Sequence, residues 1–215
     1  MYSKNPKYIV TVGDCNSDDL AEKMFPEAEL ISLRRADGGA EAYKKFDELI
    51  EKGEDVLFIT GTTPLHMSPQ AETVTKKYGI AAYLGHLNYT LMTKDPEIKY
   101  GTRFEGKSVG GISPLAGKIA ASLIGAKEYV KFIEPEDSEA AALEMDVDIV
   151  SKPTRDDVLD GAGEMHLCCD LTKEFGIRLQ YYILTPNKED HEEEALTIFN
   201  KERDFLQQFK HLALA

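Results

Sequence analysis

A glycine turn followed by an acidic residue is the stretch of the sequence best suited to hold a cofactor. Gly110 and Gly111 precede Ser113, which can cap a helix, and Glu134 comes 23 positions after Gly111. The unpaired N–H groups and the dipole at a helix start favour a phosphate or carboxylate group there. An acid about 20 residues further on is placed to accept the hydroxyls of a ribose. This spacing predicts an adenosine-type cofactor, NAD(P) first and S-adenosylmethionine second.

A simpler interpretation of the same stretch stays open. The dinucleotide fingerprint G-x-G-x-x-G is absent, because the glycines occur as GGISPLAG. The segment from Gly111 to Lys118 has five residues between its glycines, where the nucleotide P-loop has four. The alternative is an ordinary strand–helix–strand unit whose glycines only form a tight turn.

Two histidines are the candidates for acid–base catalysis. His66 and His86 come after two apolar runs that are neighbours in the sequence, so both side chains could reach one crevice. Histidine titrates near neutral pH and can act as a general acid or base. The polar residues after the predicted strands complete a substrate site: Asp14, Thr62, Thr63 and Asn88. The alternatives are hydrogen-bonded surface histidines and an ordinary strand-to-helix turn at the threonines.

Two segments contain side chains that could bind a metal ion. The acids of Asp14–Asp19 could hold Mg²⁺ through their oxygens, but capping of the following helix also accounts for them. In EMHLCCD, residues 164–170, His166, Cys168 and Asp170 would share one face of a strand. Structural zinc sites use four ligands, usually in separated pairs, and no second pair is visible. We predict no metal, and buried cysteines beside a hydrogen-bonded histidine.

Short apolar runs that alternate with amphipathic helices must position these residues. The alternation is typical of parallel strands joined by right-handed helical crossovers. We predict a Rossmann-like α/β fold, a three-layer sandwich around a mostly parallel sheet, with a long C-terminal helix. The predicted strands are residues 8–12, 30–33, 56–59, 80–84, 129–133, 147–150 and 177–184, and the predicted helices are residues 18–25, 40–52, 68–78, 114–124, 138–145 and 188–211. Residues 164–171 fit either a strand or a helix.

The sequence divides into four segments. Residues 1–87 form an N-terminal α/β half, and the polar residues 88–105 connect it to a second half, residues 106–187, which contains the cofactor site. Residues 188–215 form the C-terminal helix, whose apolar residues lie three, four or seven apart, while HEEE and KERD supply a solvated face. We expect this helix to pack on its own sheet, and a homodimer contact is the alternative.

The charge of the chain limits its partners. The 215 residues include 25 Lys and Arg against 38 Asp and Glu, a net charge of −13. A diffuse negative surface repels nucleic-acid phosphates and anionic membranes, so neither is expected as a partner. The sequence shows no signal peptide, no apolar run of 18 residues and no disulfide pattern among its three cysteines. These features predict a cytoplasmic location.

Three classes of function fit these features. The first is a cytosolic enzyme of small-molecule metabolism, an oxidoreductase or methyltransferase, with its cofactor at Gly110–Ser113 and Glu134. The second is a cofactor-free lyase, isomerase or phosphate-handling transferase that uses His66 and His86. The third is a non-catalytic ligand-binding or assembly subunit. The first class is the prediction, with a small molecule as the ligand.

Overall fold

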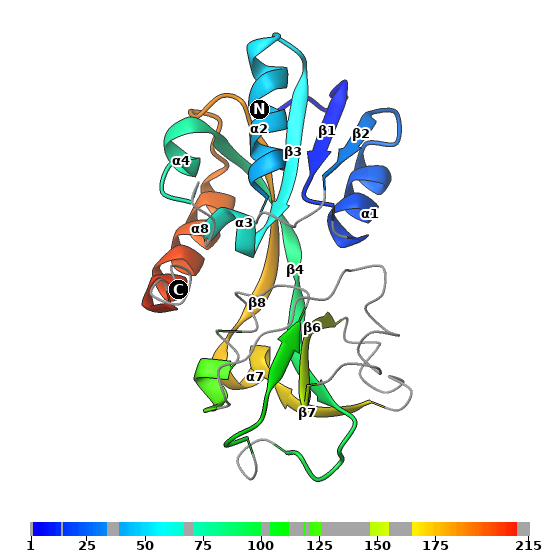
Figure 1. The fold of residues 1–215 in the computed structure, drawn as a ribbon. Coiled ribbons are helices and arrows are strands. Elements are labelled where there is room, and N and C mark those ends of the chain that lie inside the picture. The colour runs from blue at the N-terminus through cyan, green and yellow to red at the C-terminus, as the bar shows by residue number, and fades with distance from the viewer. Residues whose placement is uncertain are drawn as a thin grey trace. The chain divides into compact units, whose positions relative to one another are not determined.

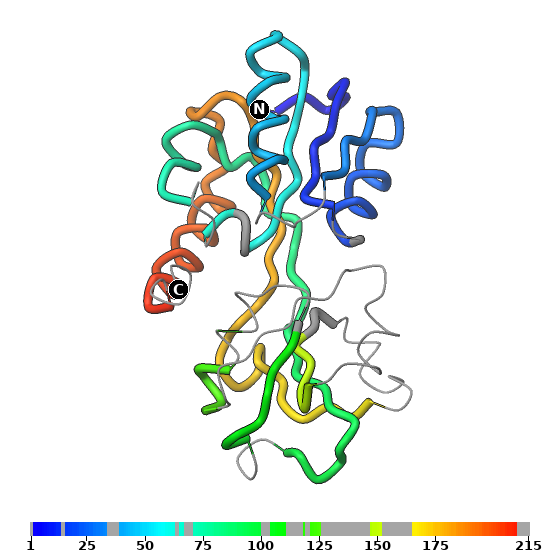
Figure 2. The backbone as a smooth tube through the Cα atoms, viewed as in Figure 1, coloured from blue at the N-terminus to red at the C-terminus, as the bar shows by residue number. Residues whose placement is uncertain are grey.

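The computed structural model describes most of the chain, as two compact units. The described residues are 2–13, 15–33, 39–66, 71–99, 104–111, 118, 121–125, 147–154 and 165–209. Unit 1 is formed by Met1–Gly85 and Gln180–Ala213, and unit 2 by His86–Leu179 with Leu214–Ala215. The chain leaves unit 1 along strand β4 (Gly79–Thr93) and returns along β8 (Arg178–Thr185), as can be followed in Figure 1 and Figure 2. Unit 1 is therefore built from two separate stretches of sequence.

Three parallel strands and β8 form most of the sheet of unit 1. β1 (Tyr8–Thr11) lies between β2 (Glu29–Ser32) and β3 (Val56–Gly61) and runs parallel to both. β8 pairs antiparallel with β3, with Phe58 opposite Leu184. The strand order is β2-β1-β3-β8-β4, so β8 separates β3 from β4.

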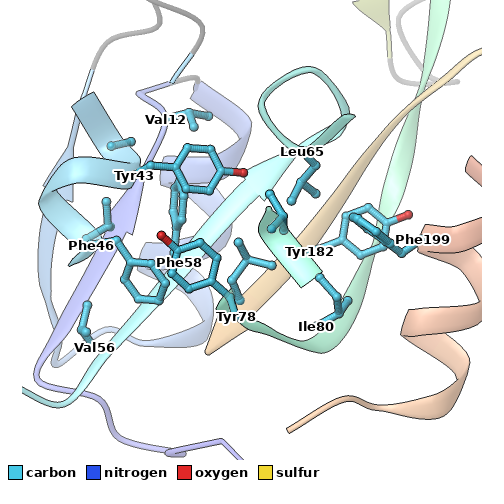
Figure 3. Close-up of a cluster of buried hydrophobic side chains, with 14 of the residues drawn as sticks. Val12, Tyr43, Phe46, Val56, Phe58, Leu65, Tyr78, Ile80, Tyr182 and Phe199 are labelled. Carbon is cyan, nitrogen blue, oxygen red and sulfur yellow. The ribbon is translucent and has the colours of Figure 1, made fainter. Parts of the chain in front are cut away.

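Helices cover both faces of these strands. One face packs on α2 (Ala40–Glu51) and α8 (Glu193–Leu206), and the other packs on α1 (Cys15–Met24). The first core cluster includes Val10, Val12, Phe58, Tyr43, Phe46, Tyr182, Ala195 and Phe199 (Figure 3). The second includes Ile9, Leu57, Ile59 and Ile183 with Ala21 and Phe25. Because β2 and β3 lie on opposite sides of β1, right-handed crossovers place α1 and α2 on opposite faces.

Glycines set both ends of α2. Gly39, with a φ of 92°, precedes the helix, and Gly53, with a φ of 71°, follows its C-cap Lys52. Left-handed backbone of this kind favours glycine because no Cβ collides with the chain. The Gly53 N–H donates to the Ile50 carbonyl at 2.9 Å and closes the last turn. The observed helix ends one residue before the predicted end at Lys52.

Gly79 begins β4 at a crowded point. A Cβ there would lie 2.6 Å from the Asp190 carbonyl oxygen and 2.6 Å from Thr185 Oγ1, and closer still to the Asn187 carbonyl oxygen. Its φ lies outside the left-handed region. Close approach of the 187–190 turn, rather than backbone conformation, therefore requires glycine here.

Among its described residues, unit 2 contains the second part of β4 with three further strands. β6 (Ile149–Thr154) and β7 (His166–Asp170) pair antiparallel with β4, and β5 (Val109–Gly111) pairs parallel with β6. The remaining named helical segments are α3 (Thr62–His66), α4 (Val74–Lys77), α7 (Leu171–Phe175) and the 3-10 turn η4 (Gln207–Phe209). No helix in the described ranges combines the length and apolar character that a membrane crossing requires.

The α/β class is confirmed, but the sheet is mixed, so the prediction of a mostly parallel sheet is wrong and its Rossmann-like detail is not supported. An apolar run is buried equally well in either direction, and the antiparallel course of β8 leaves no mark in its sequence. β4 also continues to Thr93, beyond the strand end predicted at residue 84. The C-terminal helix is shorter than predicted and passes into η4 after Leu206. The predicted strand 129–133 and helix 138–145 lie outside the described residues.

Candidate functional site

The carboxyl ends of β1 and β3 form a candidate ligand edge in unit 1. From β1 the chain continues to β2 on one side of that strand and then crosses to β3 on its other side. In open α/β sheets, ligands bind beyond the carboxyl ends of strands at such a switch point. Val12 and Gly13 follow β1, and Thr62 follows β3. We call these three residues the β1/β3 edge.

Asp18 of α1 joins the carboxyl ends of β1 and β2. Thr11, the last residue of β1, donates its hydroxyl to Oδ1, and Ser32, the last residue of β2, donates to Oδ2 at 2.7 Å. Asp18 lies in the first turn of α1, where an acid also interacts favourably with the helix dipole. Within the part of the chain that the structure describes, no three metal-ligating side chains gather. Asp14 lies outside the described residues.

A buried hydrogen-bond network lies behind the end of β3. The Glu202 carboxylate of α8 accepts from the Thr62 hydroxyl at 2.7 Å and from the Tyr182 hydroxyl at 2.9 Å. His66 Nε2 lies 2.8 Å from the same carboxylate. The His66 and Glu202 side chains are only 1% and 4% exposed. The ring of Phe199, a residue of α8, packs against the ring of Tyr182 with centroids 5.8 Å apart (Figure 3).

The protonation of this network follows from its partners. Burial, followed by the nearby Glu202 carboxylate, raises the pKa of Tyr182, so its hydroxyl stays protonated and donates. His66 Nδ1 has no hydrogen-bond partner among the described residues, and the ring packs on Phe199 with centroids 4.5 Å apart. Since a carboxylate only accepts, Nε2 carries a proton in this contact. His66 therefore acts as a donor to Glu202 in the buried interior of unit 1.

The threonines after β3 differ in what the structure describes. The Thr62 hydroxyl oxygen accepts a hydrogen bond from the Gln180 N–H at 2.8 Å, and the same hydroxyl donates a hydrogen bond to the Glu202 carboxylate. Both roles of this hydroxyl are thus used inside unit 1. Thr63 is the second residue of α3, and the structure describes its backbone but not its side chain.

His86 and Asn88 lie inside β4, so neither follows the end of a strand as predicted. His86 is exposed and belongs to unit 2, whereas His66 is buried in unit 1. Asn88 pairs with Thr154 of β6. The glycine at position 85 resembled a strand end in the sequence, but with a φ of 108° it continues within the strand.

Gly110 and Gly111 are strand residues of β5 rather than parts of a turn. They pair with β6, and the Gly110 carbonyl accepts from the Ser151 hydroxyl at 3.2 Å. Ser113 and Glu134, the other two predicted cofactor contacts, lie outside the described residues. The two described residues of the predicted cofactor site, Gly110 and Gly111, therefore take part in strand pairing within the sheet.

The cysteines of β7 are buried thiols. The β4–β7 register shifts so that Leu91 pairs with Cys169 and Met92 with Leu167, which leaves Cys168 as an extra residue of a bulge. Burial raises the pKa of both Cys168 and Cys169 to about 12. Asp170 next to them caps α7 by accepting from the Lys173 N–H at 3.0 Å.

Glu202 is the residue that sequence reasoning missed, because KERD was assigned to a solvated face. The buried residues of the C-terminal segment are Ala195, Phe199, Glu202, Leu206 and Phe209, at helical spacing. An acid in the middle of such a stripe signals a buried carboxylate that needs partners. This signal was present in the sequence.

The fold is similar to that of several solved structures. One described as a periplasmic transporter has a TM-score of 0.63 at 12% identity, covering 97% of this chain and 84% of that chain. The periplasmic sulfonate-binding protein SsuA of a putative sulfonate ABC transporter from Methylobacillus flagellatus KT has a TM-score of 0.55 at 13% identity, covering 98% of this chain and 68% of that chain. The arginine-, lysine- and histidine-binding protein ArtJ from Geobacillus stearothermophilus has a TM-score of 0.51 at 15% identity, covering 96% and 94%. No protein-family model and no curated protein matches the sequence.

These similarities overturn the predicted function. The neighbours are named as a transporter and as solute-binding proteins, so the prediction of a cytosolic oxidoreductase or methyltransferase is wrong, as is its cofactor-free enzyme alternative. Their names specify sulfonate or basic amino acids as ligands, which contradicts NAD(P) or S-adenosylmethionine as a cofactor. The cytoplasmic location is contradicted in the same way, because the first two neighbours are described as periplasmic.

The small-molecule part of the partner prediction agrees with the neighbours, which bind small solutes. The homodimer contact through the C-terminal helix is not supported. Ala195 and Phe199 of α8 belong to the core of unit 1, so the apolar stripe of the helix packs on its own sheet.

Proposed function

We propose that this protein binds a small solute reversibly and releases it unchanged, as the ligand-binding component of a transport system. The observation that carries the proposal is the likeness of the fold, over 97% of the chain, to a structure described as a periplasmic transporter. Likeness to a sulfonate-binding and an amino-acid-binding protein supports the same class. We also propose that the protein works outside the cytoplasm, which fractionation of the source cells tests.

We place the solute site of unit 1 at the β1/β3 edge. It lies where the topology of the sheet favours ligands. Gly13, with a φ of 69°, leaves its backbone open to close approach by a ligand. Two sequence-predicted substrate contacts, Asp14 and Thr63, are next to these residues in the sequence and stay candidates, and Asn88 of unit 2 stays a separate candidate. The Thr62 backbone joins them, since its hydroxyl is already bound.

A solute carrying an amine or a guanidinium group fits the carboxyl end of β1 better than a sulfonate. Asp18 is a half-buried carboxylate at the carboxyl ends of β1 and β2, with one hydroxyl donor on each oxygen. Each carboxylate oxygen can accept a further hydrogen bond, and a cationic donor forms a stronger bond than a neutral one. The net charge of −13 also attracts cations and repels anions.

Thermal shift and calorimetry with a solute panel test the proposal. The panel contains L-arginine, L-lysine, L-histidine and an alkanesulfonate, with NAD, NADP and S-adenosylmethionine as controls. We expect saturable stabilisation by a basic amino acid, which reaches about 2.7 kcal/mol at a concentration of 100 Kd. Mass spectrometry of the recovered solute should show it unchanged. Conversion of the solute, or stabilisation by the nucleotide controls alone, would contradict solute binding.

Two matched variants locate the cationic contact. Asp18→Asn removes the charge that is hydrogen-bonded to Thr11 and Ser32, whereas Asp19→Asn removes the same charge from the next, exposed position. We expect at least tenfold weaker binding of a basic amino acid in Asp18→Asn and a change below threefold in Asp19→Asn. Equal effects of the two variants would indicate only the diffuse charge of the protein.

A further inference from the structure

The five-residue helix α3 cannot hold its own orientation. It begins directly after β3 with no intervening loop residue, so its direction fixes the path of the backbone at the β1/β3 edge. Helices this short are not stable by themselves, because few internal hydrogen bonds offset the cost of starting a helix. Tertiary contacts must therefore set its position. Leu65, which is fully buried, supplies an apolar contact in its middle.

A single carboxylate holds both ends of α3. Glu202 accepts from Thr62, the first residue of the helix, and from His66, the last. The same Thr62 oxygen accepts from Gln180 N–H, so α3 is also joined to β8. For the His66 ring, Glu202 is the one polar partner among the described residues, since Nδ1 has none there. Loss of this carboxylate would release the His66 end of α3 and remove one of the two contacts that hold Thr62, while leaving Leu65 in place.

Burial of Glu202 points to orientation rather than stability. It lies on the buried stripe of α8 between Phe199 and Leu206, where an apolar side chain would pack without loss of solvation. Moving a carboxylate out of water is unfavourable, and its hydrogen bonds only offset that cost. What the carboxylate adds is a fixed arrangement of three donors from α3 and β8.

We propose that Glu202 is a positioning residue for solute binding, which holds α3 and the end of β3 in the orientation that the solute requires. The carboxylate acts through Thr62 and His66, because it is buried behind the β1/β3 edge. This inference rests on the proposed function for its affinity consequence. Its structural consequence, a loosened α3, is independent of any solute.

Hydrogen exchange in the solute-free protein tests the structural consequence. Glu202→Met removes the carboxylate with little change in volume, and Leu206→Ala is the matched control because it damages the same stripe without touching the network. The two are compared at urea concentrations that give equal free energies of unfolding. We expect amides of α3 to exchange at least tenfold faster in Glu202→Met than in Leu206→Ala. Equal exchange in the two variants would overturn the positioning role.

Glu202→Gln, the conservative variant, provides a second test if Glu202→Met folds poorly. Glu202→Gln retains one acceptor oxygen, so we expect partial rescue of α3 protection. Nitrogen-15 shifts of the His66 ring should report a protonated Nε2 in the wild type and in Glu202→Gln, whose remaining oxygen can accept from it. Exchange of the α3 amides in Glu202→Gln that is no faster than in the wild type would contradict the role of the carboxylate in holding α3.

Affinity measurements then separate this inference from the proposed function. With the solute found by the panel, we expect at least tenfold weaker binding in Glu202→Met and less than threefold in Leu206→Ala, both measured well below their unfolding temperatures. Failure to find any solute would refute the proposed function and leave the exchange result standing. Faster exchange of α3 with unchanged solute affinity would refute the coupling between α3 and the binding site.

Discussion

Tyr182 allows the buried network to be tested by mutation and pH together. Its hydroxyl donates to Glu202 at 2.9 Å. Tyr182→Phe removes this hydrogen bond to a charged group and leaves the ring in the core. Such bonds contribute about 1.5–3 kcal/mol, so we expect the free energy of unfolding at pH 7 to fall by about 2 kcal/mol.

The same substitution should matter less at alkaline pH. The pKa of Tyr182 is raised above its ordinary value of 10.0, first by burial and then by Glu202. A raised folded-state pKa gives a stability contribution that is complete below about pH 10 and is lost as the pH rises, because only the unfolded chain releases the proton. At pH 11, one such tyrosine lowers the free energy of unfolding by about 1.4 kcal/mol relative to neutral pH. Tyr43 and Tyr78 are shifted in the same direction, so the three together remove about 4 kcal/mol.

Urea unfolding at pH 7, 9, 10 and 11, followed by circular dichroism, measures the difference between the two proteins. We expect the deficit of Tyr182→Phe to narrow from about 2 kcal/mol to about 0.6 kcal/mol, since the variant lacks one of the three groups. Tyr43→Phe is the control, because it removes a buried tyrosine that is not bound to Glu202 and should show the same narrowing. A deficit of Tyr182→Phe that stays constant with pH would mean that Tyr182 ionises as easily in the folded protein as in the unfolded chain.

Two further predictions concern packing and thiol reactivity. Gly79→Ala should lower the free energy of unfolding by about 3 kcal/mol in urea titrations, because a Cβ would lie 2.6 Å from one oxygen each of Thr185 and Asp190. Gly53→Ala has open space but a φ of 71°, so we expect a loss of about 1–2 kcal/mol, and a larger loss there than at Gly79 would contradict the crowding. Cys168 and Cys169, with pKa values of about 12, should resist a disulfide reagent at pH 8 and react only on unfolding. Rapid labelling of Cys168 or Cys169 in the folded protein, located by peptide mapping to separate it from labelling of Cys15, would show that they are not buried thiols.

The sequence predicted well those elements whose signals are local. α2 has both a helical apolar stripe and a glycine at its end, and its observed bounds differ from the predicted ones by one residue. β1, β2 and β3 are short apolar runs bounded by polar residues, and each was located to within two residues. Burial and turn chemistry act over a few residues, so they can be read directly from the chain.

The features that failed depend on partners far away in the sequence. Whether β8 runs parallel or antiparallel to β3 is decided by how the chain returns from unit 2, and its apolar residues are the same in both cases. A glycine directly after an apolar run suggests a strand end, yet β4 continues through Gly85. Two of the partners of Glu202, Thr62 and His66, are 140 and 136 residues away, a separation that no local pattern encodes. The buried stripe of α8 indicated that this acid is internal, but not what it binds.

The division of unit 1 between two stretches of sequence affects how the protein folds during its synthesis. β8 and α8 complete its sheet and core, yet they follow the 94 residues of His86–Leu179. At a synthesis rate of about 5–20 residues per second, the ribosome needs roughly 5–20 s to deliver them after Gly85. During that interval β3 lacks its β8 neighbour and the nascent chain presents an open strand edge, a surface that chaperones shield and that promotes aggregation in their absence.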